Sequence, residues 1–176
     1  MRLRCGSAQP SRPMPLTKFS AHVVTALRSE PLEVIAGSEL IDRRYQEQRA
    51  AIERGFDRFR KVASLRGDGI VVFDFEIRPT ESFSRYAPFL LHRDAYYSAG
   101  LVRQGTHTKI SVMRNPWCDF ENLDVGQLCQ RFGGGGHARV GAIEVRPDGT
   151  ADATGILSEI VTRLAASLPP SPVGDR

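Results

Sequence analysis

The sequence predicts an α+β fold, in which helices pack on a small mixed or antiparallel sheet that a long linker helix precedes. Three observations support this prediction. An apolar pattern with helical spacing begins at Ser38 and continues for about 25 residues. Short runs rich in β-branched and aromatic residues begin after Gly69, and amphipathic patterns typical of helices separate them. The chain has 176 residues, of which 41% are hydrophobic, so it can build one ordinary domain or two small ones.

The first part of the chain lacks the pattern of a complete domain. Residues 1–16 contain three prolines and few apolar side chains, which is typical of a loose tail. A short helix is predicted at 20–27, and an apolar patch with the sequence LEVIAG ends at Gly37. We interpret residues 1–37 as a tail and the remnant of an interdomain segment.

Residues 38–66 are predicted to form the long linker helix. Ser38 is a good N-cap, Glu39 lies in the first turn, and apolar side chains recur at steps of three, four or seven residues. The other face of this helix carries many basic side chains with acidic ones among them. We expect these side chains to form ordinary ion pairs in solvent.

The pattern then changes to that of a sheet with interspersed helices. The run IVVFDF at 70–75 is typical of a buried strand, and residues 82–93 are predicted to form a helix. Residues 95–104 and 106–113 are predicted to pair as antiparallel strands with Gly105 at the turn.

The remaining elements alternate helix and strand. They are a helix at 124–132, a strand at 142–145 and a last helix at 153–166. We therefore predict an α+β domain over residues 67–168, followed by a disordered tail at 169–176.

Composition excludes several classes of protein. The net charge of +4 favours a nucleic-acid partner only slightly. Cys5, Cys118 and Cys129 are odd in number and form no CxxC pair, which argues against a disulfide framework or a structural zinc site. Ser, Gln and Pro follow the initial cations where a signal peptide needs apolar residues, and no apolar run is long enough for a membrane helix. We predict a cytoplasmic protein without a membrane partner.

The run of four glycines, Gly133 to Gly136, is the most unusual feature. Glycine-rich runs are common in linkers, but the apolar neighbours on both sides favour a folded turn, whose N–H groups can point at one anion. His137 can donate to a phosphate oxygen, and Arg139 can add positive charge. A purely structural imidazole is the alternative for His137.

Two further residues near the end of the strand at 106–113 are candidates. Arg114 is either a surface ion-pair partner or a phosphate ligand, the latter if the helix at 124–132 crosses back over the sheet. Trp117 can stack on a base or pack at the rim of the core.

These motifs carry a resemblance to a known family. The string FGGGGHARVGAIEV (132–145), preceded by KISVMRNPW (109–117), resembles the DHH-associated C-terminal domain of the DHH phosphoesterases. The likeness covers residues 69–167, and the long helix before it resembles the linker helix of those proteins. The family includes oligoribonucleases, phosphoadenosine-phosphate phosphatases, single-strand exonucleases and cyclic-dinucleotide phosphodiesterases.

The resemblance implies a lid-like domain that holds the nucleotide and phosphate of the substrate. Carried onto this sequence, it implies that Ser111 and Arg114 on the strand, and Gly133, Gly134, Gly135, Gly136 and His137 on the loop, bind phosphate. Arg139 occupies a variable position of the motif, so its role rests on charge alone.

The catalytic set of the family has no counterpart in this sequence. In the family an N-terminal domain with a DHH triplet and further aspartates binds two manganese ions, which activate water. Here no DHH string occurs, the ten aspartates are scattered, and only His22 precedes the linker helix. The expectation is a substrate-recognition half without catalytic residues or metal ligands, which needs Mn²⁺ only if a DHH domain is supplied.

Three functional hypotheses follow. The first is a nucleic-acid or nucleotide phosphate-binding module for a short oligonucleotide or phosphorylated nucleotide. The second is a subunit that completes a Mn²⁺-dependent phosphoesterase in trans, with the apolar patch around Leu32, Val34 and Ile35 as the interface. The third is a truncated product without function that self-associates through the linker helix. RNA, DNA, a cyclic dinucleotide and a bisphosphorylated nucleoside all remain open as the ligand.

Overall fold

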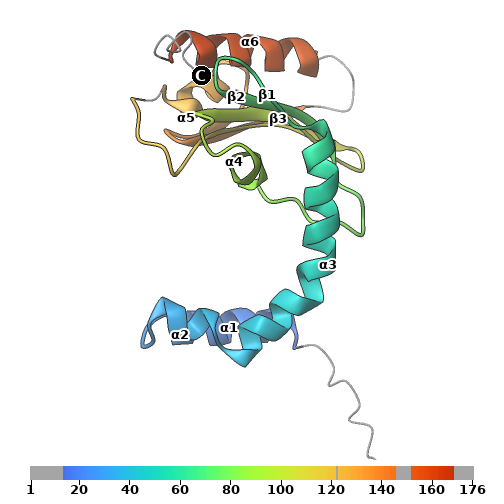
Figure 1. The fold of residues 1–176 in the computed structure, drawn as a ribbon, viewed down its shortest axis with the longest axis vertical. Coiled ribbons are helices and arrows are strands. Elements are labelled where there is room, and N and C mark those ends of the chain that lie inside the picture. Colours follow the sequence, from blue (N-terminus) through green and yellow to red (C-terminus); the bar gives the residue numbers. More distant parts are fainter. Residues whose placement is uncertain (1–13, 122, 146–151, 169–176) are drawn as a thin grey trace, which may run out of the picture. The chain divides into compact units, whose positions relative to one another are not determined.

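The computed structural model describes residues 14–121, 123–145 and 152–168 (Figure 1). Its contacts divide the chain into two units, Met1–Glu47 and Gln48–Arg176, which we describe separately. The predicted tail at 169–176 and most of the predicted N-terminal tail lie outside the described residues. The predicted fold class is confirmed, since the second unit is a mixed sheet with helices packed on it.

The first unit contains α1 (Leu16–Ala26), α2 (Leu32–Ala36) and the beginning of α3 (Glu39–Val62). Helix α1 begins before the predicted Ser20, because Pro15 fits the position that precedes a helix and its carbonyl accepts the first bond, from Phe19 N at 3.0 Å. The LEVIA patch is a helix of its own.

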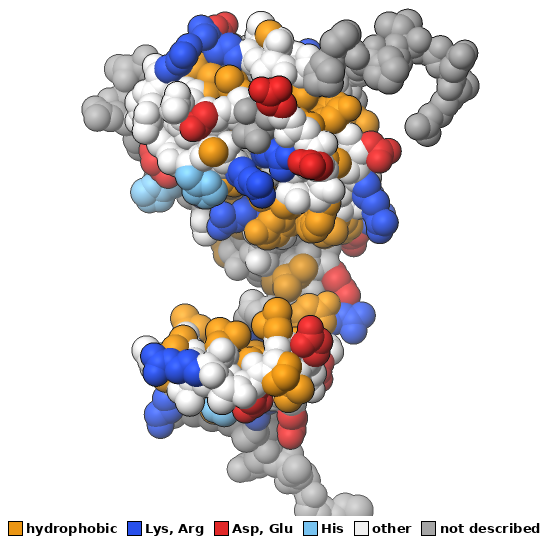
Figure 2. Space-filling model, turned by 90° about the vertical axis from the view of Figure 1, so that its left-hand side faces the viewer, with side chains coloured by type: hydrophobic (Ala, Val, Ile, Leu, Met, Phe, Trp, Pro, Cys, Tyr) orange, Lys and Arg blue, Asp and Glu red, His pale blue; other side chains and the backbone are white. Residues whose placement is uncertain are grey.

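Within the first unit the described apolar side chains are mostly exposed. Only Ala26 and Ile35 are buried there. The large exposed ones are Met14, Leu16, Val24, Leu27, Leu32, Val34 and Tyr45. Figure 2 shows hydrophobic side chains on the surface of this unit. Two members of the predicted apolar interface, Leu32 and Val34, are therefore accessible, whereas Ile35 is not.

The second unit is built on a six-stranded sheet with the order β1-β2-β3-β4-β6-β5. The strands are β1 (Ser64–Leu65), β2 (Ile70–Glu76), β3 (Tyr97–Gln104), β4 (His107–Arg114), β5 (Gly135–His137) and β6 (Val140–Val145). Strands β2 and β3 pair in parallel and all other neighbours pair antiparallel. The predicted turn between β3 and β4 is confirmed, with Gly105 at a φ of 58° that glycine adopts without strain.

Alternation along the strands gives the sheet two different faces. The covered face carries Leu101, Ile110 and Val112, which form one apolar core with α5 (Val125–Gln130) and α6 (Ala153–Ala166). The other face, here called the cavity face, is only partly covered, by the end of α3 and by α4 (Ala87–Leu91). Figure 1 shows α6 on one side of the sheet and α4 on the other.

An aromatic cluster attaches α3 to the cavity face. The Phe59 ring is fully buried, and its centroid lies 5.0 Å from that of Phe73, 5.5 Å from Phe75 and 5.3 Å from Phe83. Phe83 belongs to the segment before α4, so the same cluster fixes that segment on the sheet. Phe59 is thus the link between the helix and the cavity face.

The predicted helix at 82–93 is wrong in extent, because only Ala87–Leu91 is helical. Pro88 suits a helix start and cannot continue an earlier turn, and Ser82 N donates instead to Ala51 O of α3 at 3.1 Å. Gly55 allows this approach, since a Cβ there would overlap the Ser82 carbonyl oxygen.

Charged residues of α3 have two different roles. Arg49 pairs with Glu53 at 2.7 Å in solvent, as predicted for this helix face. Two other arginines hold the segment before α4, because Arg54 donates to Thr80 O at 2.8 Å and Arg58 pairs with Glu81. None of the helices in the described ranges combines the length and the apolar character that crossing a membrane requires.

Candidate functional site

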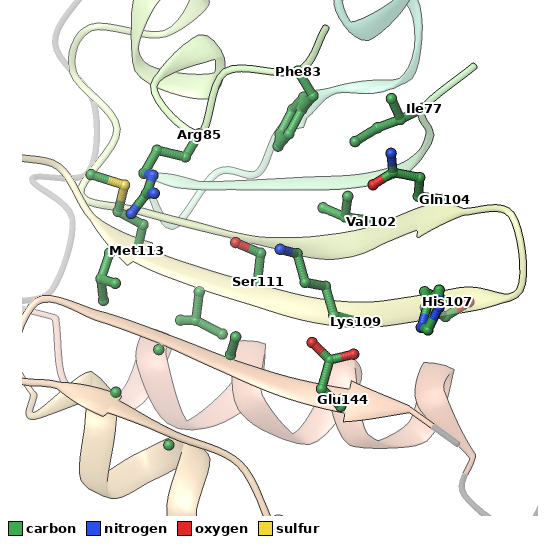
Figure 3. A pocket seen from close by; sticks show the side chains of 17 residues that line it. Ile77, Phe83, Arg85, Val102, Gln104, His107, Lys109, Ser111, Met113 and Glu144 are labelled. Carbon is green, nitrogen blue, oxygen red and sulfur yellow. The ribbon is translucent and has the colours of Figure 1, made fainter. Parts of the chain in front are cut away.

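A cavity of about 550 Å³ opens on the cavity face, where neither α3 nor α4 covers the strands (Figure 3). Its floor is formed by β3, β4, β5 and β6, and one wall is the segment between β2 and α4. The residues that line it include Ile77, Phe83, Arg85, Val102, Gln104, His107, Lys109, Ser111, Met113, Gly135, Gly136, Ala142 and Glu144.

Strand register places Ser111 in one row with the glycine run, with β6 between them. Ser111 lies opposite Ala142 of β6, and Ala142 lies opposite Gly135 of β5. Directly opposed residues of antiparallel strands share a face, so these three form one row across the cavity floor. The structure therefore places two of the predicted site residues, Ser111 and Gly135, on the floor of the same cavity, two strands apart.

The physical reason for a glycine differs among the four positions of the run. Gly133 has a φ of 77°, and a Cβ at Gly134 would overlap Ala142 O. Gly136 has a φ of 151°, and a Cβ there would overlap Val140 O. A Cβ on Gly135 would meet nothing within 4 Å, because this residue faces the cavity. Backbone conformation or close backbone contact thus requires glycine at positions 133, 134 and 136. At Gly135 the missing side chain leaves open space in the cavity.

The first two glycines close the helix that precedes them. Gly133 N donates to Gln130 O at 3.1 Å and Gly134 N donates to Cys129 O at 3.0 Å, which is the hydrogen-bond pattern of a Schellman helix end. These two N–H groups are therefore engaged in the fold. The sequence predicted a turn at the following residues, but Gly135–His137 form the edge strand β5. The turn lies further along the chain, between His137 and Val140.

Two cations face the cavity. Lys109 and Arg85 are both exposed, and neither makes an ion pair within the described part of the chain. In Figure 3 the Lys109 side chain reaches toward Ser111, and the Arg85 guanidinium points toward Met113. Glu144 lies opposite Lys109 in the register and its carboxylate points toward it. The cavity thus has two cations and one carboxylate over a floor of mixed polar and apolar residues.

His137 and Arg139 lie at the outer edge of this site. His137 is exposed on β5, and the register places it on the cavity face in a row with Val140 and Met113. Arg139 is exposed in the turn that follows, and its carbonyl accepts from Arg114 N at 2.9 Å. Neither side chain lines the cavity itself.

Arg114 is separate from the cavity. Its side chain is only 4% exposed and donates to Phe120 O at 3.0 Å and Asn115 O at 3.2 Å. Its guanidinium lies 4.3 Å from the centroid of the Phe120 ring, which packs on the covered face, and Asp119 is 3.7 Å away. Its Nε is buried without a hydrogen-bond partner in the described chain. The structure does not bring Arg114 together with Ser111.

Sequence reasoning missed Lys109, Arg85 and Phe83. Lys109 could have been found, because it lies two positions before Ser111 and strand alternation puts both on one face. Arg85 and Phe83 could not, because they lie outside regular elements and reach the cavity only through contacts with α3.

The described residues offer no metal centre. No group of three or more His, Cys, Asp or Glu side chains in the described ranges is placed to hold a metal ion. A pair of manganese ions therefore does not fit the described part of the chain.

Comparison with known proteins shows likeness of fold only. No protein-family model and no curated protein matches the sequence. The structure is similar to the pGpG-specific phosphodiesterase PggH from Vibrio cholerae, with a TM-score of 0.68 and 14% identity over 89% of this chain and 53% of that chain. It is also similar to an exopolyphosphatase-related protein from Bacteroides fragilis, with a TM-score of 0.54 and 16% identity over 84% of this chain and 44% of that one. The chain spans about half the length of these two proteins, and it shares the fold of that part of them.

Proposed function

We propose that this chain is a phosphate-binding module for nucleotides or short nucleic acids, the substrate-recognition half of a DHH-type phosphodiesterase similar to oligoribonucleases and phosphoadenosine-phosphate phosphatases. The motif resemblance supports the family. The shared fold with a pGpG-specific phosphodiesterase and an exopolyphosphatase-related protein supports a ligand that carries phosphate.

The row of Ser111 and Gly135 beside two cations carries the proposal. Lys109 and Arg85 supply charge without an ion-pair partner in the described chain, and the Ser111 hydroxyl supplies a hydrogen-bond donor. Because Gly135 has no side chain, a phosphate oxygen can approach the backbone closely. We assign Ser111, Lys109, Arg85, Gly135 and Gly136 as phosphate contacts.

Residues at the edge of the cavity have secondary roles in this proposal. His137, on the same face, extends the donor set toward a second phosphate, and Arg139 adds positive potential. The N–H groups of Gly133 and Gly134 are not phosphate donors in this proposal, because they donate to carbonyl groups at the C-terminal end of α5. Arg114 supports the loop at 115–121 instead of contacting the ligand.

Calorimetric titration of the full chain with a 5′-phosphorylated dinucleotide such as pGpG tests the proposal. Lys109→Ala and Ser111→Ala should each weaken binding, by about 10- to 100-fold for the charged contact, since a hydrogen bond to a charged group contributes about 1.5–3 kcal/mol. Arg103→Ala is the matched control. It removes a cation from the neighbouring strand β3, but Arg103 does not line the cavity and its guanidinium pairs with Asp74 at 2.8 Å. Equal affinities of wild type, Lys109→Ala and Ser111→Ala would contradict the proposed site.

A second candidate function is favoured by the apolar side chains of the first unit. Exposed Leu16, Leu32 and Val34 on α1 and α2 suit contact with a catalytic DHH domain outside these residues. This chain would then complete a Mn²⁺-dependent phosphoesterase, either in trans or within a longer protein. If adding the chain to such a domain with Mn²⁺ gives no more dinucleotide hydrolysis than the domain alone, this function is wrong.

A further inference from the structure

An exposed aromatic platform lies beside α4. It comprises Tyr86, Leu90, Arg93 and Trp117. Trp117 is the only tryptophan of the chain and is 62% exposed, while Tyr86 is 44% and Leu90 54% exposed. The Tyr86 and Trp117 ring centroids are 5.9 Å apart with the planes tilted by 49°. Contiguous exposed side chains of this size commonly mark a binding surface.

The loop that carries Trp117 is held by hydrogen bonds to the buried Asn115 side chain. Trp117 N donates to Asn115 Oδ1 at 2.9 Å, and the fully buried Asn115 donates through Nδ2 to Ala95 O at 2.7 Å and Arg93 O at 3.0 Å. The Trp117 ring also contacts the buried Phe89 edge-on, with centroids 6.5 Å apart. The indole is therefore held outward by a fixed loop, which lowers the entropy cost of stacking on it.

The platform is hollowed and carries positive charge. Phe89, Leu90, Arg93 and Trp117 line a hollow of about 320 Å³. Arg93 is exposed, and no ion pair is recorded for it within the part of the chain that the structure describes. An aromatic face next to an unpaired guanidinium suits a base and its phosphate.

The platform adjoins one end of the cavity. Arg85 lines the cavity and the next residue, Tyr86, belongs to the platform. Met113, at the same end, packs in one apolar cluster with Phe89, which forms the base of the platform. A ligand that extended past Arg85 would be directed toward Tyr86, the next residue of the chain, and toward its ring neighbour Trp117.

We propose that the platform is a stacking site for the bases of a single-stranded oligonucleotide that extends beyond the cavity, with Arg93 as a phosphate contact. The inference rests on the proposed function for the position of the first nucleotides. Trp, Tyr and Arg are also frequent at protein interfaces, but the unpaired cations and the continuity with the cavity favour nucleic acid.

Ligand length separates the platform from the cavity in an experiment. The full chain is titrated with 5′-phosphorylated oligouridylates of two and five nucleotides, and the fluorescence of Trp117 is recorded together with calorimetric affinity. The pentanucleotide should quench the fluorescence and bind roughly 5- to 100-fold more tightly than the dinucleotide, in keeping with the gain from base stacking. Trp117→Ala should remove this gain and leave dinucleotide affinity unchanged.

Two further variants complete the design. Trp117→Phe should restore part of the gain, because phenylalanine still offers a ring for stacking. Tyr45→Ala, which removes an exposed aromatic ring of the first unit, should change neither affinity.

Each remaining outcome has a definite meaning. Equal affinities for the two lengths, without quenching, overturn the platform and leave the proposed function standing. Pentanucleotide binding that Trp117→Ala abolishes, with no dinucleotide binding, supports the platform and contradicts the cavity. No binding of either length overturns both. A wild-type dimer that Trp117→Ala converts to a monomer, without length-dependent binding, shows a protein contact and overturns the platform.

Discussion

Ser111 and Arg114 lie on the same strand but on opposite faces of the sheet. Ser111 lines the cavity, whereas the Arg114 guanidinium lies over Phe120 against the covered core. Because successive side chains of a strand alternate, two residues three positions apart cannot share a face. The motif that places them close in sequence therefore joins a residue of the cavity floor to a buried cation on the other face.

Arg114→Met is expected to destabilise the fold without removing the ligand site. The change leaves the carbonyls of Phe120 and Asn115 without their donor, and it should lower the free energy of unfolding by about 2–4 kcal/mol. Urea unfolding measures the loss, and calorimetry at low urea should show unchanged dinucleotide affinity. Unchanged stability with lost binding would instead make Arg114 a ligand contact.

Neighbouring glycines of the run should respond oppositely to alanine. Gly135→Ala meets nothing within 4 Å and should leave thermal stability unchanged while weakening ligand binding about tenfold, because its methyl group projects into the cavity. Gly136→Ala should destabilise the chain by about 2 kcal/mol or more, since its φ of 151° and Val140 O both oppose a side chain. Equal stability of the two variants would refute this assignment.

Gly55→Ala should act on the cavity from a distance. The added methyl overlaps the Ser82 carbonyl oxygen and pushes the segment with Phe83 and Arg85 away from α3. We expect lower thermal stability and weaker dinucleotide binding than for Gly67→Ala, where a Cβ meets nothing within 4 Å. Full binding by Gly55→Ala would show that Arg85 is not a ligand contact.

Ligand binding should depend on salt in proportion to the number of cations used. If Lys109 and Arg85 each neutralise one phosphate, the plot of log affinity against log salt should have a slope of about −1.4, at roughly 0.7 for each single-strand contact. Lys109→Ala should reduce the slope by about half, and Arg103→Ala should leave it unchanged. A slope near zero would argue against phosphate as the recognised group.

The buried thiol of Cys129 should make stability fall in alkaline solution. Burial raises the pKa of Cys129 to about 11 from an ordinary 9.0, so the unfolded chain loses this proton at lower pH than the folded chain. The contribution is fully present below pH 9 and is lost as the pH rises toward 11. Burial also raises the pKa of Tyr97, which acts in the same direction.

Urea unfolding under reducing conditions between pH 8 and 11 measures this effect. Cys129→Ala should show a shallower fall over that range than the wild type, and Cys118→Ala should not. Parallel pH profiles of the wild type and Cys129→Ala would contradict the assignment.

Local sequence patterns were sufficient for most of the fold. The apolar periodicity of α3, the β-branched run of β2 and the glycine at the turn between β3 and β4 each express a preference of the segment itself. The helix predicted at 82–93 was too long because its segment is held by contacts of Arg54, Arg58 and Gly55, which are distant in sequence.

The sequence by itself determined the fold class, the pair of strands β3 and β4 that carries Ser111, and the glycine run, but it predicted a turn where β5 lies. Only the tertiary structure decided which of these residues meet. Sheet register puts Ser111 in line with Gly135, the Schellman end of α5 occupies the N–H groups of Gly133 and Gly134, and packing on Phe59 brings Arg85 to the cavity. The physical reason is that side-chain identity fixes local conformation, whereas proximity between strands and loops arises from hydrogen bonding and packing of segments far apart in the chain.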